Sequence, residues 1–197
     1  MVRVHPPVPL HVVPRGQQVG RCPSRQHTES CCIICIAIYK LLDYCNSVLY
    51  GFPAYLMRRL QYVQNAAARL IFRIRGSEHI SPVLISLHWL RVPERISFKL
   101  AVLTYRSIHS TVPRYLQSCF TRVVDMTSRQ RLWPSSSHHL AVLRIRLSTV
   151  GKRAFSVSGA TVWNDLPPHV TSAPSLATFR QRLKSFLFSQ SYSDIHT

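Results

Sequence analysis

The stretch that decides the fold is Pro53–Arg75, PAYLMRRLQYVQNAAARLIFRIR. Its apolar residues recur every three or four positions, which places them on one face of a helix. Pro53 suits the first helical position, and Gly76 is a plausible residue for ending the helix. We expect the apolar face to be buried, and its members are Leu56, Leu60, Val63, Ala67, Leu70, Ile71 and Ile74.

The opposite side of this helix is polar and basic. It carries Arg58, Tyr62, Asn65, Arg69 and Arg73. Arginines that follow one another along a helix can contact phosphates, and a tyrosine between them can stack on an unpaired base. This side is therefore our candidate surface for RNA or DNA, bound without reading sequence. The alternative is an ordinary solvated helix surface.

Helical spacing continues along the rest of the chain. Residues 93–109 are apolar on two sides, which predicts a helix at the centre of the core. Its narrow basic stripe includes Arg95 and Lys99, which join the candidate nucleic-acid residues. Trp89 and Trp163 lie among leucines and are expected to anchor the core. Further helices are expected at 31–49, 81–87, 113–120, 162–166 and 174–188, with Ser172 as the N-cap of the last.

One segment alternates as a strand does. Apolar residues alternate with arginines over 142–147, and Gly151 offers a turn before residues 154–157. The sequence thus predicts a mainly α fold, a small helical domain with one short β-hairpin. Residues 1–30 lack periodicity and are expected to be disordered, 31–190 to form the domain, and 191–197 to form a disordered tail.

The charge is strongly unbalanced. The chain has 25 Lys and Arg against 7 Asp and Glu, a formal net charge of +18. Such a chain favours polyanionic partners, nucleic acid first and an anionic membrane surface second. Asp43 is the lone acid in the apolar 31–49 segment, and we expect it to pair with an arginine.

The seven acids are too widely spaced along the chain to indicate the carboxylate cluster that a two-metal transferase needs. No two of them lie within ten residues of each other. Cys32 and Cys35 have a tolerable zinc spacing, but no second matching pair follows, so buried thiols are the better interpretation. No glycine-rich phosphate-binding pattern occurs. We therefore expect no enzyme activity, no metal, no cofactor and no small-molecule substrate.

The compartment follows from the cysteines and the apolar runs. Prolines break the apolar start, so no signal peptide is expected, and the six cysteines fit reduced thiols. We expect an intracellular protein of the nucleus or cytoplasm. The apolar run from Cys31 to Tyr39 is too short to span a bilayer, so no membrane span is expected.

An ordered series of short motifs extends from about residue 40 to residue 188. It resembles the region downstream of the polymerase core in non-LTR, LINE-type retrotransposon reverse transcriptases. The motifs are LDYCNS (42–47), LQYVQNAAARLI (60–71), HISPVL (79–84), LHWL (87–90), RISFK (95–99), PRYL (113–116), RAFS (153–156), VWNDLP (162–167) and the helix at 172–188.

The resemblance implies a truncated tail rather than a whole enzyme. In that family the polymerase carboxylates and the endonuclease domain lie upstream, so at most non-specific RNA or DNA binding is expected. Residues 1–38 do not match the family. Arg91 and Lys152 depart from it by adding positive charge, which indicates a degenerate element.

Two other functions stay open. The chain could be a domesticated or accidental basic module that binds acidic proteins and has no nucleic-acid role. It could also be a basic protein that binds the membrane surface peripherally.

Overall fold

The computed structural model describes residues 49–125, 139–145 and 148–193. Within these ranges it contains helices and no strands, which confirms the mainly α prediction. Residues 1–30 and most of the helix expected at 31–49 lie outside the described part. The elements are α3 (Ala54–Phe72), α4 (Ser81–Ser86), α5 (Val92–Ile108), α6 (Arg114–Gln117), the 3-10 turn η1 (Val123–Asp125), α7 (Ser148–Gly151), α8 (Phe155–Asn164), α9 (Pro168–Thr171) and α10 (Leu176–Ser191).

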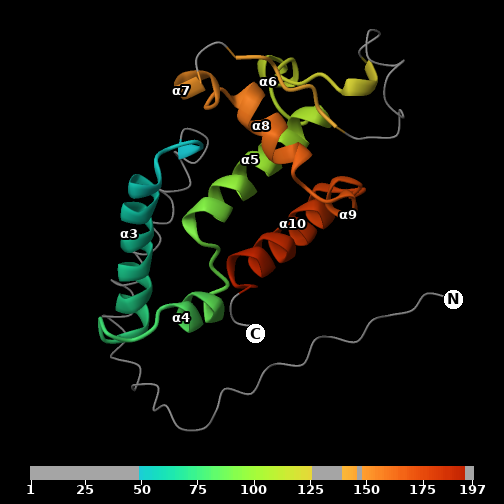
Figure 1. The fold of residues 1–197 in the computed structure, drawn as a ribbon. Coiled ribbons are helices and arrows are strands. Elements are labelled where there is room, and N and C mark those ends of the chain that lie inside the picture. Colours follow the sequence, from blue (N-terminus) through green and yellow to red (C-terminus); the bar gives the residue numbers. More distant parts are fainter. Residues whose placement is uncertain (1–48, 126–138, 146–147, 194–197) are drawn as a thin grey trace, which may run out of the picture.

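Helix α5 lies at the centre, as its two apolar sides predicted. It packs against α3, α6, α8 and α10, and Figure 1 shows it between α3 and α10 with α8 crossing its far end. Pro93 in the first turn lacks the N–H that a helix start would leave unpaired. Glu94 in the first turn and Arg106 in the last suit the helix dipole.

Three aromatic rings join the central helices. The ring of Phe179 on α10 stacks on that of Tyr105 on α5, with centroids 4.5 Å apart, and lies 5.8 Å from the ring of Trp163 on α8. The Tyr105 hydroxyl also donates to the carbonyl of Ala173 at 3.2 Å. Trp163 is therefore the core anchor that the sequence predicted.

A second, smaller cluster joins α3 and α4 to the end of α10. Ala68, Leu84 and Tyr192 are its buried members, and Trp89 packs against them half-buried. The Tyr192 hydroxyl donates to the Trp89 carbonyl at 2.6 Å, and burial raises the pKa of Tyr192 to about 12. Ser191 and Tyr192, which the sequence assigns to a disordered tail, thus belong to the packed structure.

The predicted β-hairpin within 142–157 is wrong. Residues 142–145 have no strand partner, and residues 154–157 lead into α8. The small residues Ser158, Gly159 and Ala160 are fully or nearly fully buried where α8 meets α5, and that close packing outweighs the weak strand preference before them. The backbone of Leu140 pairs instead with the Asn164 amide, through two hydrogen bonds of 2.9 Å.

Two helix ends also differ from expectation. Helix α3 stops at Phe72 because Arg73 adopts a left-handed conformation with φ of 51°, so Gly76 is not its terminating residue. Helix α10 begins at Leu176, where the Ser175 hydroxyl accepts from the Thr178 N–H, so Ser175 rather than Ser172 is the N-cap.

Gly159 is required where α8 crosses α5. A Cβ there would lie 2.6 Å from Thr104 Oγ1 and 2.7 Å from Phe120 Cζ. Gly159→Ala should destabilise the protein by about 1–3 kcal/mol, because overpacking outweighs the better helix propensity of alanine. Gly76→Ala is the control, since a Cβ there meets nothing within 4 Å. Equal unfolding free energies for the two variants in urea denaturation would contradict the close packing described here.

Candidate nucleic-acid surface

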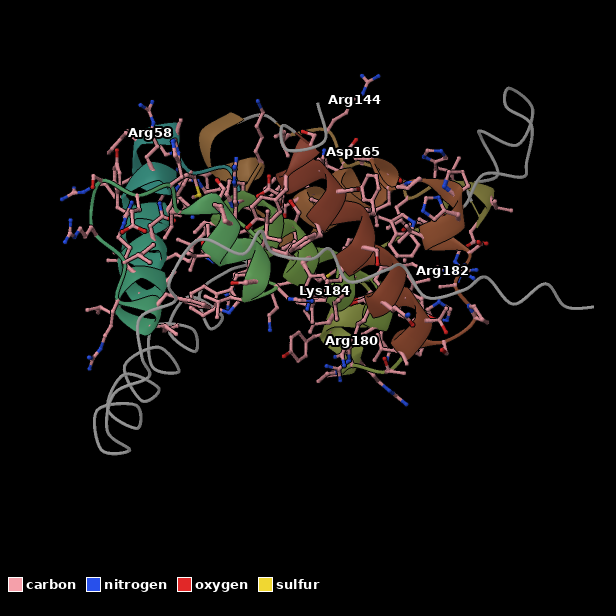
Figure 2. All side chains as sticks on the ribbon, turned by 90° about the horizontal axis from the view of Figure 1, so that it is seen from below. Arg58, Arg144, Asp165, Arg180, Arg182 and Lys184 are labelled. Atoms are coloured by element: carbon pink, nitrogen blue, oxygen red, sulfur yellow. The ribbon has the colours of Figure 1, made fainter. Side chains whose placement is uncertain are left out.

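The exposed side of α3 carries tyrosines and arginines in one line. Tyr55, Arg58, Tyr62 and Arg69 recur at intervals of three, four and seven residues, which keeps them on the same side of a helix. Tyr55 is 59% exposed and Tyr62 68%. At 1.5 Å per residue the line extends about 21 Å along the axis. We call these four residues the α3 line, and Figure 2 shows Arg58 projecting away from the core.

The structure separates the six predicted site residues. Arg58, Tyr62 and Arg69 come together on the α3 line, and Arg73 follows at the exposed end of α3. Arg58 and Tyr62 are exposed, whereas Arg69 is half-buried and its Nε atom is inaccessible. Lys99 is exposed on α5, whereas Arg95 on the same helix is only 4% exposed. A guanidinium buried to that extent does not offer itself to a phosphate, so Arg95 drops out of the surface.

The sequence analysis missed two exposed residues on this side of α3. Tyr55 belongs to the α3 line, and Arg59 is exposed beside it. Both lie in the first two turns of α3, where the sequence analysis assigned only Arg58 to the polar side. Extending the three-and-four spacing back from Arg58 would have found Tyr55.

The buried side of α3 is rotated from the predicted one. Val63 is 45% exposed and Leu70 53%, although both were assigned to the buried face. Gln64, which is polar, is instead 1% exposed, next to the buried Ala67 and Ala68. Counting glutamine as a surface residue moved the predicted face away from its true centre.

Two glutamine amides cause this rotation. Gln64 Nε2 donates to the Leu90 carbonyl at 2.8 Å, and Gln61 Oε1 accepts from the Val92 N–H at 2.9 Å. Leu90 lies in the link that leads from α4 into α5, and Val92 is the first residue of α5. The amides therefore hold α3 against this link, and that attachment decides that the α3 line faces outward.

The charge around the α3 line is positive. Helix α3 contains three arginines and no acid. Among the described acids, Glu78 accepts from the Arg75 N–H beyond the end of the helix, and Glu94 acts on the pKa of Tyr192. Nothing within α3 neutralises the arginines, so its exposed side suits an anionic partner.

Positive charge is not confined to α3. Arg180, Arg182 and Lys184 are exposed on α10, and Figures 1 and 2 place them away from Arg58 across α5. No aromatic side chain as exposed as Tyr62 is recorded on α10. The α10 group thus provides a matched set of charges without the tyrosines.

A hollow of about 560 Å³ lies beside the end of α5 and α6. Arg114, Arg122 and Asp125 line it, so it carries charges of both signs.

Two residues near the ends of the described helices have shifted pKa values. The pKa of His109 is lowered, first by partial burial and second by the charge of Arg122. Tyr50 has a raised pKa, first through burial and then through Asp165.

The part of the chain that the structure describes offers neither a metal-binding cluster nor a membrane-spanning helix. No group of three or more His, Cys, Asp or Glu side chains there could hold a metal ion. No helix in these ranges has the length and apolar character to cross a membrane.

Comparisons with protein-family models, curated proteins and solved structures find no match for this chain.

Gln64 should be needed to keep α3 in place. Gln64→Ala removes the donor to Leu90 and leaves a small cavity, so we expect a loss of about 1–3 kcal/mol in the free energy of unfolding. Gln181→Ala, at an exposed site on α10, should cost less than about 0.5 kcal/mol. Chemical denaturation of both variants checks this, and a neutral Gln64→Ala would refute the attachment.

Proposed function

We propose that this chain binds RNA or DNA without sequence preference through the α3 line. We also propose that it derives from the tail of a LINE-type reverse transcriptase and is not itself an enzyme. The observation that supports binding is the alternation of Tyr55, Arg58, Tyr62 and Arg69 on one side of a helix without acids, with Tyr55, Arg58 and Tyr62 exposed and Arg69 half-buried. The motifs from Leu42 to Pro167 support the proposed origin.

The binding would combine two physical effects. The arginines neutralise phosphates and release the counterions condensed on them, a contribution that is independent of sequence and falls with salt. Tyr55 and Tyr62 offer ring faces on which unpaired bases can stack. Their spacing of seven residues separates them by about 10 Å along the helix, room for more than one nucleotide between the rings.

The salt dependence of binding tests the arginines. The triple variant Arg58→Gln, Arg59→Gln, Arg69→Gln should lower the slope of log affinity against log salt by roughly 2–3 units. Fluorescence anisotropy with a labelled oligonucleotide over a range of salt concentrations measures this slope.

The matched control places the same loss of charge on α10. It replaces Arg180, Arg182 and Lys184 with Gln, all exposed in the structure. We expect a smaller change in slope, because these charges lack the neighbouring tyrosines and the linear arrangement. Equal slopes for the two triple variants would show that binding depends on the net charge of the chain and not on the α3 line.

Tyr62 should matter most for single strands. Tyr62→Ala should weaken single-strand binding by about 1–3 kcal/mol, because a base loses its stacking partner, and duplex binding by less. Tyr115→Ala is the control, since Tyr115 is 70% exposed on α6. Titrations of the same sequence as a single strand and as a duplex give the comparison, and equal losses on both would argue against stacking.

A second candidate function is a basic module that binds acidic proteins. The exposed Val63 and Leu70 beside the α3 line favour it, because adjoining apolar side chains are common in protein interfaces. Polyglutamate and an RNA of equal charge separate the two functions. RNA should bind more tightly under the nucleic-acid proposal, whereas equal or tighter binding of polyglutamate would favour the protein partner.

A further inference from the structure

The hollow beside the end of α5 and α6 is large enough for a small organic ligand. Its volume of about 560 Å³ lies within the range of roughly 300–1,000 Å³ that is typical of small-molecule sites. The lining residues come from the end of α5, from α6 and from the segment between Phe120 and Asp125, with Leu140 beside them. None of them belongs to α3. The hollow is therefore separate from the α3 line, and binding here is independent of the proposed function.

Hydrogen bonds fix one wall of the hollow. Gln117 Nε2 donates to the Val112 carbonyl at 2.6 Å and to the Ser110 carbonyl at 3.4 Å. Ser110 has a left-handed φ of 55°, a conformation that costs energy in any residue other than glycine. Backbone strain of this kind is concentrated at ligand-binding and catalytic sites. The wall is thus held in place without a ligand, which lowers the entropic cost of binding one.

The lining also includes an aromatic ring and a buried hydroxyl. Phe120 is half-buried, and its ring packs edge-on against that of Phe155 with centroids 5.0 Å apart. Ser107 is 3% exposed, and its hydroxyl donates to the Leu103 carbonyl at 2.9 Å. Its oxygen can still accept a hydrogen bond. A ligand with an aromatic part and hydroxyl groups would match this lining.

The charged residues of the hollow indicate what such a ligand would carry. Arg114, Arg122 and Asp125 are all exposed, and within the described residues their side chains form no hydrogen bond or ion pair with one another. Two guanidinium groups at one site suit a phosphate, because each can donate two parallel hydrogen bonds to its oxygens. An ionised carboxylate only accepts, so Asp125 suits an amino group.

We propose that this hollow binds a nucleoside phosphate whose base carries an exocyclic amino group, as cytosine and adenine do. Arg114 and Arg122 bind the phosphate, Phe120 contacts the base, and Asp125 accepts from the amino group. A carboxylate accepts from the cytosine amino group but repels the carbonyl oxygen that uracil has at the same position. The ligand is either a free nucleotide or the phosphorylated end of a strand, which present the same groups. It was not expected from the sequence, which has no glycine-rich phosphate-binding pattern.

Isothermal titration calorimetry of the full chain tests the class of ligand. Cytidine monophosphate should bind about tenfold or more tightly than uridine monophosphate, which lacks the amino group. It should exceed cytidine, which lacks the phosphate, by a factor of about ten or more. Absent binding of cytidine monophosphate, or equal affinities for the three compounds, would overturn the proposal.

Substitutions at exposed positions assign the roles without disturbing the core. Asp125→Asn should reduce the preference for cytidine over uridine monophosphate to below about threefold. Arg114→Gln with Arg122→Gln should weaken binding of cytidine monophosphate about tenfold or more, and binding of cytidine by less than about threefold. Arg180→Gln with Arg182→Gln removes the same charge on α10 and should change either affinity by less than about threefold. Equal effects of the two double variants would overturn the site.

Competition separates the two sources of the ligand. It uses the triple variant of the α3 line, so that strand binding there does not contribute. A short single strand ending in a phosphorylated cytidine should displace cytidine monophosphate if the hollow accepts strand ends. No displacement by this strand, with cytidine monophosphate still bound, assigns the hollow to free nucleotides. Equal displacement by the same strand without its terminal phosphate would overturn the proposal.

Discussion

The stacking of Tyr105, Trp163 and Phe179 is the contact on which the described structure depends. These rings come from α5, α8 and α10, which are far apart in sequence, and their centroids lie 4.5 to 6.4 Å from one another. Large aromatic side chains bury much apolar area and favour offset or tilted contacts, so they fix both the spacing and the orientation of helices. Gly159 then allows α8 to lie close to α5, since any larger side chain would collide with Thr104 and Phe120. Helices α3 and α6 pack on α5, α9 packs on α10, and α4 is attached through α3.

Helix α3 is attached differently, and the difference matters for function. Its described attachments to the core include the packing of the small side chains of Ala67 and Ala68. They also include the two glutamine amides, which bond to Leu90 before α5 and to Val92 at the start of α5. Hydrogen bonds of this kind are directional, so they fix the rotation of the helix about its own axis more sharply than apolar packing does. That rotation exposes the tyrosines and arginines together. The proposed binding side thus results from how α3 is held rather than from where its apolar residues fall.

The local errors of the sequence analysis have one common cause. Residues 142–147 alternate as a strand does, and Ala154–Val157 resemble a return strand, but the described residues 142–145 have no strand partner and residues 155–157 form the first turn of α8. A strand is stable only when its backbone pairs, whereas a helix satisfies its own hydrogen bonds. Residues 155–164 instead satisfy their backbone within α8 and pack on α5. Buried Gln64 and buried Arg95 were misplaced for a related reason, because a polar side chain is buried only when the fold supplies what it needs.

The sequence by itself determined the helical class, the central position of α5, the core role of Trp163 and the presence of basic residues with tyrosine along α3. These follow from periodicity and composition, which act locally and need no knowledge of neighbours. Only the tertiary structure decided which side of α3 faces out, that Arg95 is buried while Lys99 is exposed, and that α10 continues to Ser191 and packs Tyr192. These features depend on contacts between residues up to 103 positions apart, such as Tyr192 with Trp89. Local spacing carries no information on such pairs, because the partner of a buried polar group is set by how the helices meet.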